Sequence, residues 1–184
     1  MAVVIRLAAS PAEVAGIKAL QTANLASRLS EAERAAEGFV TAEYSLEFLL
    51  EMHRETPAVI ATDDGVVVGY ALVTTRELGA AHELVRSLVQ AVDGMEYRGL
   101  MLSTARYVLC GQLCVAKTHR GQGLAGALYG HFREALCADY DFLVTDVDTT
   151  NWRSSQAHRK AGFEVLATLG YGGAGWDVVI QDWR

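Results

Sequence analysis

The sequence has few cysteines and few prolines. Only 3 of its 184 residues are cysteines, and Cys110, Cys114 and Cys137 lie in apolar segments without a Cys-x-x-Cys spacing. This scarcity argues against a disulfide scaffold and a structural zinc site, so we expect reduced cysteines, no bound metal and a cytoplasmic protein. The 2 prolines, Pro11 and Pro57, lie where the first predicted helix begins and where the N-terminal helices end.

Long apolar runs are also missing. Residues 3–5 are apolar, but Arg6 interrupts them at once, so we expect no signal peptide. No later segment approaches the roughly 20 apolar residues that a membrane-spanning helix needs. We therefore expect no membrane partner.

Basic residues are fewer than acidic ones. The chain has 16 lysines and arginines against 22 aspartates and glutamates, which gives a net charge of -6. A protein that neutralises phosphates along a nucleic acid needs a basic face, so nucleic acid is not an expected partner. The hydrophobic share of 51% and the mean hydropathy of +0.16 predict a globular chain, and the length predicts a single domain over residues 1–184.

The sequence does contain a phosphate-binding pattern in residues 113–128. Its first residues alternate as in a β-strand, Gly121 and Gly123 follow Arg120, and apolar residues then recur at helical spacing. Glycines leave backbone N–H groups accessible, and a helix N-terminus carries partial positive charge. The stretch therefore predicts a strand, an anion-binding turn and a helix that together hold a phosphate or diphosphate.

Periodicity and turn residues predict the elements around this stretch. Strands are expected at residues 3–8, 58–62, 66–75, 107–116, 140–147, 163–169 and 175–183, with a glycine-rich turn at 170–175. Helices are expected at residues 11–29, 45–54, 81–92, 122–138 and 151–161, while residues 30–38 are compatible with helix or loop. The spacing of Leu84, Leu88 and Val92 indicates the buried face of the third helix. Residues 76–106 are expected as an insertion between strands, and residues 107–147 as a parallel strand–helix–strand unit.

Two common phosphate-binding folds do not fit the pattern. Gly121, Gly123 and Gly126 spell the Gly-x-Gly-x-x-Gly of dinucleotide-binding folds, with Asp146 near the position of the acidic ribose ligand. However, residues 117–120 separate the glycines from the strand, and too little chain follows Asp146 to complete a doubly wound sheet. A nucleoside-triphosphate loop is excluded because no Gly-Lys-Ser/Thr sequence follows the glycines.

The same glycines fit a different signature. The pattern Arg120-x-x-Gly123-x-Ala125, after a strand that contains Leu113 and Val115, closely resembles R/Q-x-x-G-x-G/A. That pattern is the coenzyme A signature of the GNAT acetyltransferase superfamily.

A second motif lies downstream. Asn151-x-x-Ser154, followed by His158-x-x-x-Gly162-Phe163, resembles the N-x-x-A and Y-x-x-x-G-F motif of the same family. Both motifs stand in the family's order and at its spacing, and each follows a predicted strand. The resemblance is strong over residues 107–163, and the coarse order of elements matches elsewhere.

The resemblance implies a fold, a co-substrate and a set of contacts. The implied fold class is α/β (α+β), with a GNAT-like mixed, mostly antiparallel sheet, a central splayed pair of parallel strands, and helices on both faces. The implied co-substrate is acetyl-CoA, whose pantetheine arm would pair with residues 113–115 and whose diphosphate would lie over residues 120–126. The cofactor-binding residues implied in this way are Leu113, Cys114, Val115, Arg120, Gly121, Gln122, Gly123, Leu124, Ala125, Gly126, Asn151 and Ser154.

The resemblance also implies two catalytic groups. The Val115 N–H is expected to donate a hydrogen bond to the developing oxyanion. His158 stands where the family often has a tyrosine that protonates the thiolate, and an imidazole with a pKa of about 6.5 can protonate a thiolate whose acid has a pKa of about 8.5. Ser154, one helical turn earlier, is expected to orient the ring. The alternative is that His158 only packs under the cofactor.

The general base stays open at this point. Glu43, Glu77, Asp146 and Asp148 all lie in segments that could face the site, and water could also accept the proton. Cys114 lies on the key strand, but alternation along a buried strand explains a cysteine without a catalytic role.

These observations predict an acetyl-CoA-dependent N-acetyltransferase that acts on a primary amine of a small molecule, by direct attack within a ternary complex. One alternative is a non-catalytic acyl-CoA-binding or sensing module, and another is a weakly active scaffold that interacts through its N-terminal helices. His158 at the proton-donor position favours the enzyme. A homodimer is compatible with the sequence. The acceptor cannot be identified from the sequence, because residues 22–44 and 76–106 match no motif.

Overall fold

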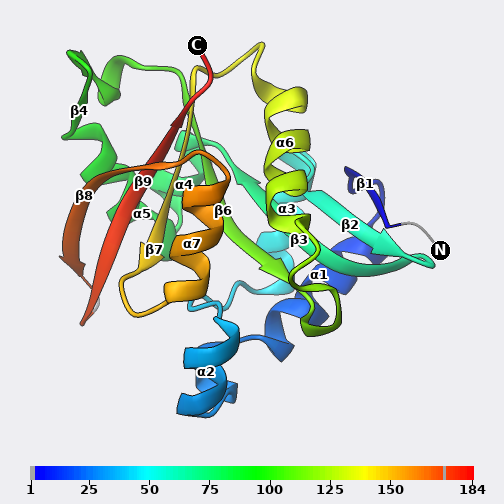
Figure 1. Cartoon of the computed structure of the whole chain (residues 1–184). Helices are drawn as coiled ribbons and strands as arrows, with labels where there is room; N and C mark the ends of the chain where they lie inside the picture. Colours follow the sequence, from blue (N-terminus) through cyan, green and yellow to red (C-terminus); the bar gives the residue numbers. More distant parts are fainter. Residues whose placement is uncertain (1–2, 172) are drawn as a thin grey trace.

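The structure is a computed structural model that describes residues 3–171 and 173–184. A 7-stranded sheet in the order β1-β2-β3-β6-β7-β9-β8 runs through the molecule (Figure 1). Its strands are β1 (Val4–Leu7), β2 (Val59–Asp63), β3 (Val66–Thr74), β6 (Tyr107–Val115), β7 (Phe142–Asp148), β8 (Glu164–Tyr171) and β9 (Ala174–Asp182). A separate 2-stranded hairpin consists of β4 (Glu96–Tyr97) and β5 (Leu100–Met101).

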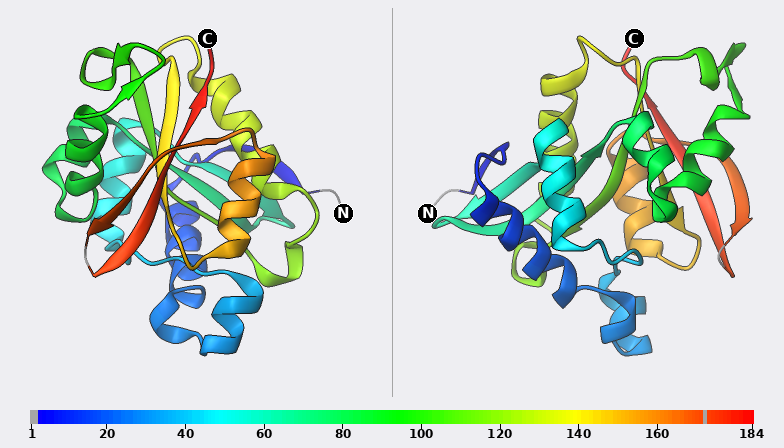
Figure 2. Two further views of the ribbon diagram at one scale, coloured as in Figure 1. Left: turned by 60° about the vertical axis from the view of Figure 1, so that its left-hand side comes forward. Right: turned by 180° about the vertical axis from the view of Figure 1, so that it is seen from behind.

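Helices cover both faces of the sheet. They are α1 (Pro11–Ala23), α2 (Glu31–Glu37), α3 (Leu46–Glu55), α4 (Arg76–Ala81), α5 (Glu83–Asp93), α6 (Leu124–Leu136) and α7 (Trp152–Lys160), with 3₁₀ turns η1 (Ala26–Arg28), η2 (Leu102–Thr104) and η3 (Lys117–His119). Helices α6 and α7 lie on one face, whereas α1, α3 and α5 lie on the other (Figure 2). No helix within the described residues is both long enough and apolar enough to cross a membrane.

Side-chain caps explain where the N-terminal helices begin. Ser10 accepts a hydrogen bond from the Glu13 N–H at the start of α1, where a proline occupies the first turn. Ser30 and Glu33 form a reciprocal capping box on α2, and Ser45 caps α3. The short, charged α2 is therefore a helix rather than a loop, which settles the two readings that its sequence allowed.

The central strands β6 and β7 are parallel over a short distance and then diverge. Their register runs from Tyr107–Phe142 to Leu109–Val144, although both strands continue beyond it. From there β6 stays paired only with β3, and β7 only with β9. All other described neighbours in the sheet are antiparallel. The predicted fold class, a mostly antiparallel sheet with a splayed parallel pair, is confirmed.

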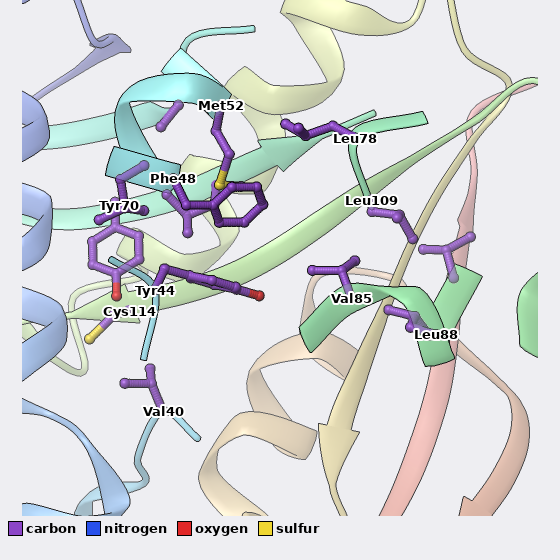
Figure 3. Packing of buried hydrophobic residues seen from close by; sticks show 14 of the residues in the cluster. Val40, Tyr44, Phe48, Met52, Tyr70, Leu78, Val85, Leu88, Leu109 and Cys114 are labelled. Carbon is purple, nitrogen blue, oxygen red and sulfur yellow. The ribbon is translucent and has the colours of Figure 1, made fainter. Parts of the chain in front are cut away.

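The core on the α1, α3 and α5 face extends from the N-terminal helices to the insertion. In Figure 3, Tyr70 and Cys114 lie close together at one end of this core, and Val85 and Leu88 of α5 lie at the other. The buried face of α5 is formed by Val85, Leu88, Val89 and Val92. Leu84, which the sequence placed on this face, is 49% exposed. The helical spacing was correct, but the first buried residue of this face is Val85 rather than Leu84.

Three other sequence predictions need correction. The helix expected over residues 11–29 ends at Ala23, because Leu25 pairs with Val40 and turns the chain. Helix α6 begins at Leu124 rather than residue 122, because Gly123 caps it with a left-handed φ of +79°. Residues 76–106 hold α4 and the β4–β5 hairpin in addition to the expected helix. The expected turn at residues 170–175 includes Gly172, which lies outside the described residues.

Candidate active site

A cleft of about 440 Å³ opens beside the separated ends of β6 and β7. Its walls come from the end of β6, the glycine loop, the first turn of α6, helix α7 and residues 37–40. Of the residues predicted to bind the cofactor, all except Gln122 line this cleft. Of the two predicted catalytic residues, Val115 lines it and His158 does not. The structure thus brings together two motifs that lie far apart in the sequence.

The strand wall of the cleft offers main-chain groups at Leu113 and Val115. The Ala116 N–H donates to the Val68 carbonyl at 2.8 Å, so the main-chain groups of Ala116 face β3. Main-chain groups alternate in direction along a strand, so those of Cys114 also face β3. The N–H and C=O groups of Leu113 and Val115 consequently face the cleft.

The glycine loop provides open space and hydrogen-bond donors. Gly121 and Gly123 have φ values of +77° and +79°, and no side chain caps the N-terminus of α6. A Cβ added at Gly121, Gly123 or Gly126 would meet nothing within 4 Å. The first N–H groups of α6 have no acceptor within the helix, and they lie at the positive end of its dipole. This arrangement fits a diphosphate group.

The Arg120 side chain is bonded to protein acceptors. Its Nε donates to the Val115 carbonyl at 2.9 Å, and its Nη2 donates to Asn24 Oδ1 at 2.6 Å. Its Nη1 donates to both the carbonyl and the carboxylate of Glu37, at 2.8 and 2.9 Å. The guanidinium therefore connects the loop before α6 to the C-cap of α1 and to the last residue of α2. The resemblance implied a cofactor contact for Arg120 but did not indicate these partners.

Residues 24–40, which we call the helical cap, contain η1 and α2 and close on themselves. The Val40 N–H donates to the Asn24 carbonyl at 3.0 Å, and the Ala26 N–H donates to the Val40 carbonyl at 2.9 Å. The two ends of the cap therefore lie side by side. In Figure 1 the cap lies below α7 and beside α1.

The helical cap is attached to both walls of the cleft. On the β6 side, beyond the Arg120 contacts, Lys117 Nζ lies 3.0 Å from Glu33 Oε1. On the α7 side, Asn151 Nδ2 donates to the Phe39 carbonyl at 2.8 Å. Gly38 packs so closely there that a Cβ would lie 3.0 Å from Asn151 Oδ1. The cap therefore spans the open end between the diverging strands.

Asn151 has a structural role in addition to its place in the motif. Its Oδ1 accepts a hydrogen bond from the Ser154 N–H at 3.2 Å, so it is the N-cap of α7. Its amide nitrogen holds the helical cap, as described above. Asn151 and Ser154 both line the cleft, opposite the strand wall.

His158 lies behind the cleft wall, between α7 and α6. Its Nδ1 is 2.8 Å from the Ser154 carbonyl, which can only accept, so Nδ1 carries the proton. Its Nε2, 2.7 Å from the Tyr129 hydroxyl, is then the acceptor of that hydroxyl's proton. Burial lowers the pKa of His158 to about 4, so the ring is neutral at pH 7. The expected contact with Ser154 is present. However, the ring does not line the cleft, as a proton donor to the thiolate would, because its Nε2 accepts the hydrogen bond of the Tyr129 hydroxyl.

Asp146 is the carboxylate best placed beside the diverging strands. It lies two residues beyond Val144, the last residue of β7 that pairs with β6. By alternation it shares the Val144 face, toward α1, α3 and α5, and it is partly buried. Burial, and after it the charge of Asp146, raises the pKa of Tyr44. Tyr44 donates to the Gly111 carbonyl of β6 at 3.0 Å, two residues beyond the last pair that β6 forms with β7.

The other candidate bases differ from Asp146 in position. Glu43 is exposed and lies 3.0 Å from Lys18 Nζ. Asp148 accepts hydrogen bonds from the N–H and the hydroxyl of Thr150, at 2.8 and 2.6 Å. Glu77 lies in the first turn of α4, within the insertion. Position therefore separates Asp146 from three carboxylates that the sequence could not rank.

The thiols on β6 are poor nucleophiles. Burial raises the pKa of Cys110 to about 12 and also that of Cys114 to about 12. The thiolate is the reactive form of cysteine, so both side chains are almost entirely unreactive thiols at pH 7. Within the described residues, no group of three or more His, Cys, Asp or Glu side chains is arranged to hold a metal ion.

Sequence reasoning missed the partners of the motif residues. Asn24 and Glu37 bind Arg120 across 96 and 83 positions of sequence, and Tyr129 binds His158 across 29. Each of these residues fits an ordinary helical context. The capping box of α2 could locate the helix, but no local signal shows which residue its last turn contacts.

The sequence profile of the Acetyltransferase (GNAT) family matches residues 22–163. No curated protein matches the chain by sequence.

Solved structures resemble the whole fold. The NatC complex bound to Gag peptide and CoA matches with a TM-score of 0.67 and 17% identity, over 100% of each chain. A GNAT-family acetyltransferase from Streptococcus agalactiae 2603 matches with a TM-score of 0.67 and 17% identity, over 99% of this chain and 96% of that one. YncA from Salmonella typhimurium with its cofactor acetyl-CoA matches with a TM-score of 0.63 and 19% identity, over 100% of this chain and 95% of that one. At such low identity these likenesses show the fold.

Proposed function

The chain belongs to the acetyltransferase (GNAT) family and is an acyltransferase, and from this premise we propose that it acetylates a primary amine of a small molecule. The acetyl group would come from acetyl-CoA, and the amine would attack it directly within a ternary complex. The observation that carries the proposal is the cleft itself. An open strand edge and an uncapped, glycine-rich helix N-terminus line the same cavity.

The residues present fit acetyl-CoA. When bound, this co-substrate supplies an activated acyl group. Leu113 and Val115 would hold the pantetheine arm through their main-chain groups, and the N–H groups of residues 121–126 would hold the diphosphate. Asn151 and Ser154 would form the opposite wall. The NatC and YncA structures, which contain CoA and acetyl-CoA, support this assignment by likeness of fold.

The proposed chemistry uses two groups of this chain at the reacting atoms. The Val115 N–H would donate to the acetyl oxygen as negative charge develops on it. Asp146, on the face of the strands opposite to α6 and α7, would take a proton from the acceptor ammonium and release the neutral amine for attack. The buried thiols support direct transfer, because a covalent acetyl-cysteine step would need a thiolate.

His158 has a positioning role in this proposal. A ring with a pKa of about 4 is neutral at pH 7, and its remaining proton is directed at the Ser154 carbonyl. It would hold α7 against α6 and so fix the wall that Ser154 forms. The departing thiolate would take, through water, the second proton that the attacking nitrogen loses as it becomes an amide.

The helical cap supports a small acceptor. Residues 37–40 are attached to both walls of the cleft and would limit the space for an acceptor at the open end of the strands. A compact amine would pass such an entrance more readily than a folded protein surface.

The test is a thiol-release assay with acetyl-CoA and a panel of amines, amino acids, polyamines and aminoglycosides. The panel should include a peptide with a free N-terminus, because the NatC structure contains a peptide. We expect turnover with at least one small amine and intersecting initial-rate lines. Parallel lines would contradict direct attack. Binding of acetyl-CoA without turnover of any acceptor would favour the sensing module instead.

A further inference from the structure

We infer that Asn24 and Glu37 are positioning residues for acyl transfer. They act through Arg120, whose hydrogen bonds attach the helical cap to the cofactor loop. We call these hydrogen bonds the latch. This inference rests on the proposed function for its kinetic readout. It assigns the motif arginine to the cap rather than to the diphosphate. The contacts that carry it are hydrogen bonds from one guanidinium to two cap residues and to the strand.

The geometry leaves Arg120 little capacity for another ligand. Three of its nitrogens donate to four acceptors at 2.6–2.9 Å, and two of these acceptors belong to Glu37. The side chain is only 16% exposed. A phosphate could recruit the guanidinium only by displacing the Glu37 carboxylate and Asn24. The glycine loop beside it already offers main-chain donors, so such a displacement is not needed for phosphate binding.

The latch joins parts of the site that do different tasks. The Val115 carbonyl, which accepts from Arg120, belongs to the residue whose N–H faces the cleft. Asn24 and Glu37 lie near the two ends of the helical cap, so one guanidinium fixes both ends at once. The cap residues 37–40 also form part of the cleft wall. The main-chain donors of the glycine loop belong to α6 and not to the cap, so loss of the latch should affect the acceptor more than the cofactor.

The Lys117–Glu33 pair provides a matched control on the same helix. It also joins α2 to the segment after β6, but both side chains are exposed, by 43% and 46%. Exposed ion pairs contribute little, whereas hydrogen bonds to a partly buried charge contribute more. Glu33→Gln removes the same charge as Glu37→Gln, and glutamine can still complete the capping box with Ser30.

The experiment compares Arg120→Gln, Glu37→Gln, their double variant and Glu33→Gln. For the acceptor that turns over best, we expect kcat/KM to fall about 30-fold for Arg120→Gln and about fivefold for Glu37→Gln. The double variant should be no worse than Arg120→Gln alone, because both changes break one contact. Acetyl-CoA affinity, measured by calorimetry, should change by less than about threefold in every variant, and Glu33→Gln should match the wild type.

Two outcomes would overturn the latch. The first is that Arg120 binds the diphosphate when acetyl-CoA is present. In that case Glu37→Gln should release the guanidinium and tighten acetyl-CoA binding, and Arg120→Gln should weaken that binding about tenfold or more. Fully additive losses in the double variant would also contradict a single shared contact.

Hydrogen exchange separates failure of the latch from failure of the proposed function. Amides of residues 24–40 should exchange faster in Arg120→Gln and Glu37→Gln than in Glu33→Gln, whether or not any amine is acetylated. Equal exchange in all three variants would reject the latch. An absence of thiol release by the wild type, with the exchange pattern as expected, would reject only the proposed function.

Discussion

The two sides of the cleft are built in different ways. The side that we propose for the cofactor presents main-chain groups: the outward-facing edge of β6, the glycine loop and the first turn of α6. The side that we propose for the acceptor is held by side chains, with Arg120 and Asn151 attaching the helical cap to the two walls. Main-chain recognition needs only a certain backbone shape, which a short local motif can specify. Side-chain attachment needs partners from distant segments, which the fold must bring together.

The largest loss of turnover is expected when Asp146, the proposed general base, loses its charge. We expect Asp146→Asn to lower kcat roughly a thousandfold, because removing a general base typically costs between a hundredfold and ten-thousandfold. The affinity for acetyl-CoA should not change, because Asp146 is not among the residues that line the cofactor cleft. Steady-state kinetics and calorimetry check the two expectations. Asp148→Asn is the matched control, since asparagine can still accept from the Thr150 N–H. Unchanged kcat with chemistry rate-limiting would show that water is the base.

A change in the glycine loop should instead weaken the binding of acetyl-CoA. We expect Gly123→Trp to weaken acetyl-CoA binding roughly a hundredfold, because the indole fills the open space and blocks donors to the diphosphate. Gly65→Trp is the control, since Gly65 has the same φ of +79° and open surroundings but lies in the β2–β3 turn. The two variants should lose similar stability in thermal unfolding. Equal affinity for acetyl-CoA in both variants would remove the glycine loop from the cofactor site.

The wall between the two sides should respond to pH through His158. Burial lowers its pKa to about 4, whereas the same histidine in the unfolded chain has a pKa of about 6.5. Between these two pH values the unfolded chain therefore binds a proton that the folded chain does not. The resulting stability is complete above about pH 6.5 and is lost as the pH falls toward 4. We expect the wild type to lose about 2 kcal/mol more than His158→Gln between about pH 6.5 and pH 4.5 in urea unfolding.

His131→Gln, at a partly exposed position on α6, is the control for replacing a histidine by glutamine. The same His158→Gln variant separates the positioning role from acid catalysis. A kcat within about tenfold of the wild type at pH 7 supports positioning. A loss of a hundredfold or more, with the fold intact and acetyl-CoA still bound, would restore His158 as the general acid.

The smallest effect is expected at Cys114, where both sides meet on β6. Cys114→Ser should change kcat by less than about threefold, because burial raises the pKa of this thiol to about 12 and leaves almost no thiolate. Abolished turnover with unchanged acetyl-CoA binding would instead indicate a covalent intermediate. Cys137→Ser, at an exposed position, gives the baseline for a cysteine replacement.

The sequence by itself determined the strands and the glycine-rich turn before α6, because alternation, capping and left-handed glycines act over a few residues. The fold class and the diverging strand pair followed from the resemblance of its two motifs to the GNAT family. Gly121 and Gly123 adopt the positive φ that a phosphate loop requires.

Only the tertiary structure decided what the charged and polar side chains do. His158 occupies the family's tyrosine position, yet its ring faces Tyr129 because α6 packs against α7 there. Arg120 occupies the cofactor motif, yet its partners lie 83 and 96 positions away in the helical cap. Asp146 differs from the other candidate bases only by its place beside the strand opening. A side chain's role depends on which distant acceptor or charge the fold brings within about 3 Å, and no local pattern contains that information.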